Sequence, residues 1–133
     1  MIKFVLDASV AGCWLGDEDL TPAQEELQKR AFVGEAVVPT LFRYELANVV
    51  LSKSRSIKIK DQDFILEHLS QLPINVDFEE PAYSELHRIG TSMELSAYDA
   101  AYLELASRLN LPLATYDKKL ASAARRFGIE VLG

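Results

Sequence analysis

Two aspartates follow short apolar runs that are typical of strands, and their position is the first indication of chemistry. Asp7 comes directly after Phe4-Val-Leu, and Asp117 ends the segment Leu113-Ala-Thr-Tyr-Asp117. In open α/β sheets, ligands bind at the carboxyl ends of the strands, where both side chains would emerge. A turn or capping role explains Asp7 equally well. For Asp117 taken alone, an N-cap before Lys118 is the simpler explanation.

Two further acids lie near the starts of predicted helices. Glu45 falls between Leu41 and Val49 on the apolar face of its helix, where an unpaired charge is costly to bury. It therefore needs a cation, unless it reaches water at the edge of that face or pairs with Arg43. Asp99 completes a Ser-x-x-Asp capping box, which is a full structural explanation. Its helix nevertheless feeds a parallel strand and so begins at the same carboxyl edge of the sheet.

Together these four carboxylates predict a site for a hard cation. Four negative charges on one edge repel one another unless they are protonated or neutralised. Ligation by oxygen alone, without His or Cys, suits Mg²⁺ or Mn²⁺ and disfavours zinc. Carboxylates that hold one or two such ions commonly activate water for attack on phosphorus. The hydroxyls of Ser9 and Thr115 could orient that water or a carboxylate, although ordinary turn hydroxyls explain them as well.

The elements that must position these acids follow an alternating pattern. Short apolar runs alternate with longer segments of helical period, which predicts an α/β fold around a five-stranded, mainly parallel sheet. The predicted strands cover residues 2–6, 36–39, 74–78, 112–115 and 129–132. The predicted helices cover residues 22–32 after the N-cap Thr21, 41–54 after Thr40, 62–72 after Asp61, 81–89, 97–109 after Ser96, and 118–127.

Length and composition limit the possible classes of protein. With 133 residues, of which 49% are hydrophobic, the chain suits a single domain over residues 1–133. We expect no targeting segment, because Asp7 interrupts the first apolar run, and no membrane span, because no apolar stretch approaches about 20 residues. The single Cys13 cannot form an internal disulfide, as suits the reducing cytoplasm.

The charge balance at first opposes a nucleic-acid partner. The sequence has 14 Lys and Arg against 20 Asp and Glu, a net charge of −6. Its distribution weakens that objection, because Lys and Arg outnumber the acids in residues 43–60 and again in residues 117–126. A solvated face is the simpler explanation of either run taken alone. If the four acids hold divalent ions, the acidic balance no longer argues against RNA.

Four segments of the sequence carry the acids. They are Val5-Leu-Asp7-Ala-Ser9, Pro39-Thr-Leu-Phe-Arg-Tyr-Glu45-Leu-Ala-Asn48, Leu95-Ser-Ala-Tyr-Asp99-Ala-Ala-Tyr-Leu and Leu113-Ala-Thr115-Tyr-Asp117-Lys-Lys-Leu. In this order they resemble the PIN domain, in the compact form of the VapC-type toxin ribonucleases of bacterial and archaeal toxin–antitoxin pairs. The resemblance implies a three-layer α/β/α fold, Mg²⁺- or Mn²⁺-dependent endonucleolytic cleavage of RNA, a homodimer, and inhibition by a VapB-type antitoxin.

The same resemblance implies a role for each matching residue. Asp7 and Asp99 would be the principal metal ligands, and Glu45 and Asp117 would complete the catalytic acidic site, directly or through water. One carboxylate would help to deprotonate the attacking water. Ser9 and Thr115 match the family's hydroxyls beside the first and last acids, and Asn48 matches a frequent polar position one turn after Glu45.

Two alternatives differ from a nuclease. A receiver-like phosphoacceptor module also sets carboxylates at a sheet edge, but it would use adjacent acids after the first strand, whereas Asp7 stands alone. A PIN-like scaffold that binds RNA or protein without cutting would normally have lost one acid, and all four are present. His68 and His87 have no Cys or His partner at metal-ligand spacing, so they do not suggest a zinc site.

Overall fold

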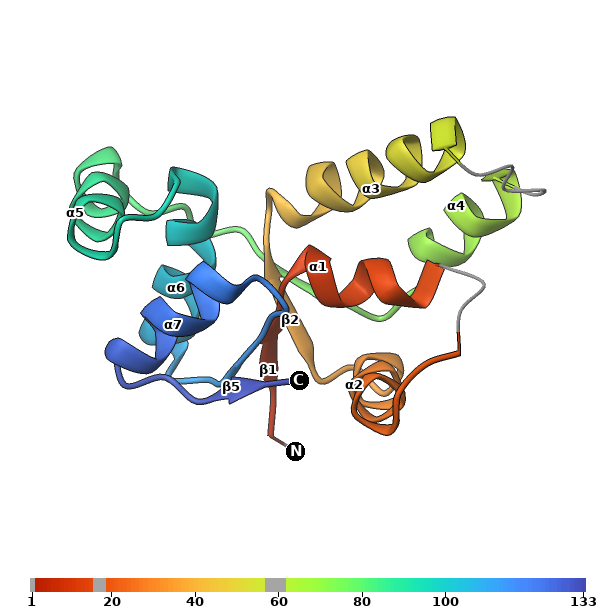
Figure 1. The fold of residues 1–133 in the computed structure, drawn as a ribbon, viewed down its shortest axis with the longest axis horizontal. Helices are drawn as coiled ribbons and strands as arrows, with labels where there is room; N and C mark the ends of the chain where they lie inside the picture. Colours follow the sequence, from red (N-terminus) through yellow and green to blue (C-terminus); the bar gives the residue numbers. More distant parts are fainter. Residues whose placement is uncertain (1, 16–18, 57–61) are drawn as a thin grey trace.

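The computed structural model describes residues 2–15, 19–56 and 62–133 (Figure 1). The strands are β1 (Phe4–Leu6), β2 (Ala36–Pro39), β3 (Asn75–Asp77), β4 (Leu113–Ala114) and β5 (Val131–Leu132). The helices are α1 (Ala8–Ala11), the 3₁₀ helix η1 (Gly12–Leu15), α2 (Pro22–Phe32), α3 (Phe42–Ser56), α4 (Gln62–Ser70), α5 (Tyr83–Met93), α6 (Ala97–Leu109) and α7 (Lys118–Arg126). None of the helices in the described ranges is long and apolar enough to cross a membrane.

The strands form one parallel sheet in the order β3-β2-β1-β4-β5. The sequence predicts a mainly parallel sheet, and each strand pair is parallel. The chain builds outward from β1 to β2 and β3, then crosses to the other side of β1 to add β4 and β5. The order therefore reverses between β1 and β4. In open α/β sheets this switch point is where ligands bind.

Helices cover both faces of the sheet, which confirms the predicted three-layer α/β/α arrangement. The helices α1 to α4 lie on one side and α5 to α7 on the other (Figure 1). Alternate residues of a strand point to opposite faces. Phe4 and Leu6 accordingly pack in one core with Leu27 of α2, whereas Val5 packs in the other core with Leu103 of α6.

The segment directly after Asp7 differs from the sequence prediction. No helix is predicted between the first strand and Pro22, yet residues 8–15 form α1 and η1. Helices this short are not stable through propensity alone. Val10 and Ala11 are fully buried in the core, so tertiary packing stabilises the turn that aligns Asp7.

Most helix boundaries lie within two residues of the predictions, but α5 covers Tyr83–Met93 where residues 81–89 are predicted. The ranges of α2 and α6 are as predicted, and Thr21 caps α2 in a complete capping box. The predicted N-cap Thr40 is wrong, because α3 begins at Phe42 and the Thr40 hydroxyl donates to Glu80 Oε1 at 3.0 Å. The predicted N-cap Asp61 lies outside the described residues.

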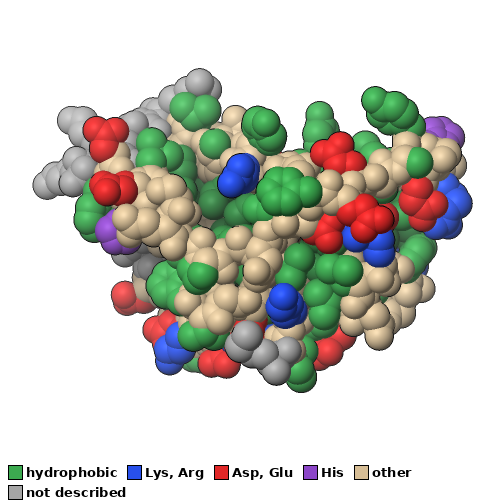
Figure 2. Space-filling view, turned by 180° about the vertical axis from the view of Figure 1, so that it is seen from behind, with side chains coloured by type: hydrophobic (Ala, Val, Ile, Leu, Met, Phe, Trp, Pro, Cys, Tyr) green, Lys and Arg blue, Asp and Glu red, His purple; other side chains and the backbone are tan. Residues whose placement is uncertain are grey.

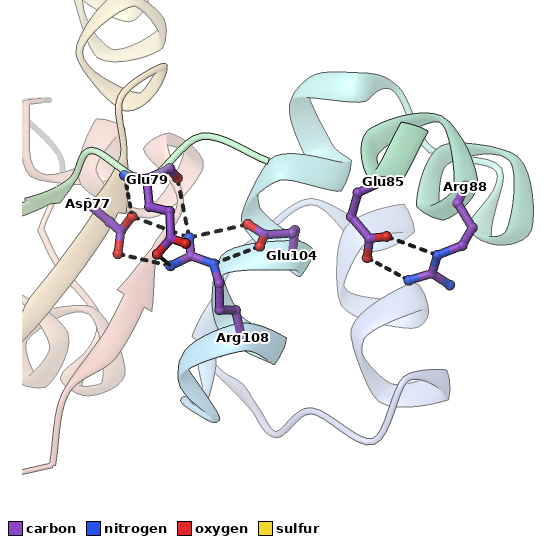
Figure 3. Close-up of polar contacts among 6 residues, drawn as sticks. All are labelled: Asp77, Glu79, Glu85, Arg88, Glu104 and Arg108. Carbon is purple, nitrogen blue, oxygen red and sulfur yellow. Dashed lines mark hydrogen bonds and ion pairs between the residues drawn. The ribbon is translucent and has the colours of Figure 1, made fainter. Parts of the chain in front are cut away.

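Arg108, near the end of α6, joins this helix to the end of β3 (Figure 3). Its Nε donates to Glu104 Oε1 at 2.7 Å, its Nη2 to Asp77 Oδ1 at 3.2 Å and its Nη1 to Glu79 Oε2 at 3.1 Å. The side chains of Arg108 and Glu104 are 24% and 10% exposed. Guanidinium–carboxylate hydrogen bonds that are partly shielded from water are stronger than surface ion pairs. The network therefore fixes α6, the helix that also carries Asp99, against the sheet.

We expect Arg108→Met to lower the free energy of unfolding by about 2 kcal/mol, because three carboxylates lose their shared cation. Urea unfolding followed by circular dichroism measures the change. Arg88→Met is the matched control, because Arg88 pairs with Glu85 on the exposed surface of α5, and little change is expected there (Figure 3). Equal losses in the two variants would mean that the Arg108 network contributes no more than a surface pair.

Candidate active site

Asp7 is held by two hydroxyl groups, one from Ser9 in the first turn of α1 and one from Thr115 directly after β4. Its Oδ2 accepts hydrogen bonds from Ser9 Oγ and Thr115 Oγ1, both at 2.7 Å. The backbone N–H of Tyr116 donates to Ser9 Oγ at 3.0 Å, and that of Asp117 donates to Thr115 Oγ1 at 3.1 Å. Each hydroxyl thus accepts from a backbone N–H and donates to the same carboxylate oxygen. The described hydrogen bonds do not use the other oxygen, Oδ1.

The structure excludes one of the local explanations of Asp7, a capping hydrogen bond from its side chain. Although Asp7 precedes α1, its side chain makes no capping hydrogen bond to that helix. Its backbone N–H donates to Ala114 O at 3.0 Å, which continues the β1–β4 pairing beyond Leu6. The residue is only 6% exposed, and a buried carboxylate needs hydrogen-bond donors such as these hydroxyls. The Asp7 carboxylate therefore lies at the switch point of the sheet and does not cap α1.

The capping explanation applies to Asp117 but only partly to the Ser96–Asp99 pair. Asp117 is exposed at the start of α7, and its Oδ1 accepts from Leu120 N at 2.9 Å. Ser96 Oγ accepts from Asp99 N at 3.1 Å. The return hydrogen bond that would complete the box is not among the described hydrogen bonds, and the Asp99 carboxylate is half-buried. Helix capping thus accounts for one oxygen of Asp117 and leaves the Asp99 carboxylate unexplained.

Glu45 lies in the first turn of α3, where its inward position follows from the apolar face of the helix. Its neighbours on that face, Phe42 and Leu46, are buried, and Glu45 itself is half-buried. Tyr102 of α6 donates its hydroxyl proton to Glu45 Oε1 at 2.6 Å. The structure therefore brings Glu45 inward, as its helical position predicts, and pairs it with a phenol instead of with Arg43.

The four acids influence one another electrostatically. Burial raises the pKa of Glu45, and the charges of Asp7 and Asp99 raise it further, against the lowering effect of the Tyr102 hydrogen bond. Burial also raises the pKa of Asp99, together with the charges of Asp117 and Asp7, while the Ser96 hydrogen bond and Lys119 act in the opposite direction. All four carboxylates consequently share one negative field at this edge of the sheet.

The donor set fits a hard divalent cation by its chemistry. It consists of carboxylate oxygens, and a cation would offset both the burial and the mutual repulsion that raise the pKa values of Glu45 and Asp99. Within the described ranges, however, no three His, Cys, Asp or Glu side chains lie close enough together to form a ready-made metal site. The acids thus supply a negative electrostatic potential and carboxylate oxygens outside the described hydrogen bonds, but they do not form a complete coordination shell for a metal ion.

The acids lie beside, and not inside, a cavity of about 480 Å³ between the end of β2 and helices α5 and α6. Leu41, Tyr98 and Ala101, which neighbour the acids in sequence, line this cavity, but none of the four acids does.

Two residues that contact or influence the acids are not predicted from the sequence. Tyr102 contacts Glu45, and it lies three residues after Asp99 on the same face of α6, a spacing that could have identified it. Lys119 acts on the Asp99 carboxyl from the first turn of α7. By contrast, Asn48 is exposed one turn after Glu45, and no described hydrogen bond joins it to the acids.

Two solved structures are similar to this chain across nearly its whole length. PAE2754 from Pyrobaculum aerophilum has a TM-score of 0.76 at 22% identity, and the similarity covers 98% of this chain and 89% of that chain. FitAcB from Neisseria gonorrhoeae has a TM-score of 0.67 at 18% identity, covering 98% of this chain and 96% of that chain. At these identities the likeness shows the fold alone. Comparison with curated protein sequences finds no match.

The sequence family is shown by a separate comparison. The family model of the PIN domain matches residues 4–126, a range that includes the four acids and both hydroxyls that hold Asp7. PIN domains are generally nucleases and generally use divalent metals. The chain therefore belongs to the PIN domain family.

Proposed function

We propose that this chain is a divalent-metal-dependent endoribonuclease that acts as the toxin of a type II toxin–antitoxin pair in the cytoplasm. The observation that carries the proposal is the shared field of Asp7, Glu45, Asp99 and Asp117 at the switch point of the sheet. Structural roles alone do not explain three of these carboxylates. A bound cation would relieve their repulsion, and hydrolysis of a phosphodiester bond is the chemistry that such clusters commonly perform.

The proposed roles follow the contacts of each acid. Asp7 and Asp99 would hold Mg²⁺ or Mn²⁺, and Glu45 and Asp117 would complete the site directly or through water. A bound cation would supply a nucleophilic water and would stabilise negative charge on the phosphate. Ser9 and Thr115 fix the direction of the Asp7 carboxylate by their two hydrogen bonds. One of the four carboxylates, through an oxygen that does not bind the cation, would accept the proton of the attacking water.

RNA must approach an edge that also carries cations. Lys118 and Lys119 are the first two residues of α7, directly after Asp117. Both are exposed, so they suit contacts to the phosphates of RNA. On the face shown in Figure 2, Lys and Arg side chains lie apart from one another, separated by hydrophobic and other side chains. The remaining basic residues of the 43–60 run, namely Lys53, Arg55, Lys58 and Lys60, lie outside the residues whose side chains are described.

A VapB-type antitoxin and a homodimer are the partners that the motif resemblance supports. Expression of the chain alone should arrest growth of a bacterial host, and co-expression of a small open reading frame adjacent to its gene should restore growth. Rescue by that frame would identify the antitoxin. A non-cleaving PIN scaffold is the second candidate. It predicts RNA binding without cleavage and no growth arrest that depends on Asp7.

We expect Asp7→Asn to reduce Mg²⁺-dependent RNA cleavage at least about 100-fold, because the amide replaces the central carboxylate ligand. The fold should be retained, since Asn Oδ1 can still accept hydrogen bonds from Ser9 and Thr115. Cleavage of a labelled RNA, with and without EDTA, measures the loss, and the melting temperature checks the fold. Glu130→Gln is the matched control, because Glu130 is exposed before β5, at the opposite edge of the sheet. Wild-type cleavage by the Asp7 variant would exclude this mechanism.

We expect Glu45→Gln to raise the melting temperature of the metal-free protein by a few degrees at pH 7. Because the folded state raises the pKa of Glu45 above its ordinary value of 4.5, the folded state binds protons more tightly than the unfolded chain. Wild-type stability should therefore fall as the pH rises from that value through the raised pKa. The neutral Gln removes this loss, so the two proteins should converge near pH 4.

Calorimetry between pH 4 and 8 in the presence of EDTA measures this difference, with Glu67→Gln as the exposed carboxylate control on α4. Added Mg²⁺ should stabilise the wild type more than Glu45→Gln, because the ion binds the folded state. A Glu45→Gln variant that is less stable than the wild type at pH 7 without metal would contradict the raised pKa of Glu45 in the folded state.

A further inference from the structure

Tyr102 is a fully buried side chain of α6 whose hydroxyl reaches the acidic edge. The hydroxyl donates to Glu45 Oε1 at 2.6 Å, and the backbone N–H of Ala8 donates to the hydroxyl oxygen. One phenol thus joins α6 to the first turn of α3 and to the turn that follows Asp7. The three segments are far apart in the sequence and meet at this oxygen.

The direction of these hydrogen bonds is determined by the surroundings. A phenol carries its proton at neutral pH, whereas the facing Glu45 oxygen can only accept when the carboxyl is ionised. The Tyr102 hydroxyl therefore donates to Glu45 and accepts from Ala8. Since Oε1 of Glu45 is occupied by this bond, the second oxygen, Oε2, is the one that is left for a cation or a water molecule.

We infer that Tyr102 is a positioning residue of the nuclease site, which orients the Glu45 carboxylate relative to Asp7. The inference rests on the proposed function. Packing alone does not call for a hydroxyl here, because Phe would fill the same space without a polar group that must find partners in the core. Asp99 lies one turn earlier on the same face of α6, so this single helix supplies one acid and orients another.

Different groups therefore orient the Asp7 and Glu45 carboxylates. Ser9 of α1 and Thr115, directly after β4, hold Asp7, and Tyr102 of α6 holds Glu45. Groups that orient a metal-binding carboxylate through its unused oxygen commonly change metal affinity or activity by about 10- to 100-fold when removed. Tyr102 should act through Glu45 and should therefore matter little when Glu45 is already replaced.

The test is a double-mutant cycle of Tyr102→Phe and Glu45→Gln, with Tyr98→Phe as the matched control on the exposed side of the same helix. We expect Tyr102→Phe to lower kcat for RNA cleavage by about 10-fold or more with little change in KM, and to weaken Mn²⁺ binding, measured by calorimetry, by about 10-fold. In the Glu45→Gln background the same substitution should change both quantities less than about 2-fold. Tyr98→Phe should leave them at the wild-type values.

A second variant separates the hydroxyl from the packing of the ring. Replacement of Tyr102 by 4-aminophenylalanine restores a hydrogen-bond donor to Glu45 and should recover most of the Mn²⁺ affinity that Tyr102→Phe loses. This comparison holds even if Tyr102→Phe lowers the melting temperature, since both variants keep the aromatic ring.

The outcomes distinguish the inference from the proposed function. If the wild type cuts RNA and binds Mn²⁺ but Tyr102→Phe does both equally well, the positioning role is overturned and the nuclease stands. Equal losses from Tyr102→Phe in the wild-type and Glu45→Gln backgrounds also overturn it, because the effect then does not pass through Glu45. If the wild type neither cuts RNA nor binds Mn²⁺, the proposed function fails and the positioning role fails with it.

Discussion

The two hydrogen bonds that Ser9 and Thr115 donate to one oxygen of Asp7 set the geometry of the candidate site. They tie the ends of β1 and β4 together at the point where the strand order of the sheet reverses. Backbone N–H groups of the β4–α7 connection bind the same hydroxyls, so the site and the chain turn share one hydrogen-bond network. A buried carboxylate can be held here only because each hydroxyl has both its donor and its acceptor capacity satisfied.

Charge repulsion is the cost of this arrangement. Burial and neighbouring carboxylates raise the pKa values of Glu45 and Asp99, which means that the folded state disfavours their ionised forms. Burial of apolar side chains in the two hydrophobic cores on either side of the sheet offsets this unfavourable electrostatic free energy. The proposed metal-binding role would account for this cost, because a cation would replace repulsion between the acids with attraction to the ion.

Helix α6 links the site to the rest of the fold. Its first turn carries Asp99, its second turn carries Tyr102 against Glu45, and its last turn carries Arg108 against the end of β3. The helix is almost entirely buried from Ala100 to Ala106, so its position relative to the sheet is tightly constrained. A displacement of α6 would thus move Asp99 and break the Tyr102 hydrogen bond to Glu45 at once.

The strand and helix order, the parallel sheet and the inward position of Glu45 could all be predicted from the sequence, because hydrophobic periodicity and capping residues act locally. The positions of Asp7, Asp99 and Asp117 at one sheet edge followed from the same rules of topology. The hydrogen-bond partners of Asp7 and Glu45 could not be predicted in this way, because Thr115 and Tyr102 reach these acids only after distant segments have packed together. Packing likewise formed α1 and η1 and left the Asp7 side chain without a capping hydrogen bond to α1, since burial and long-range contacts outweigh local propensity at these positions.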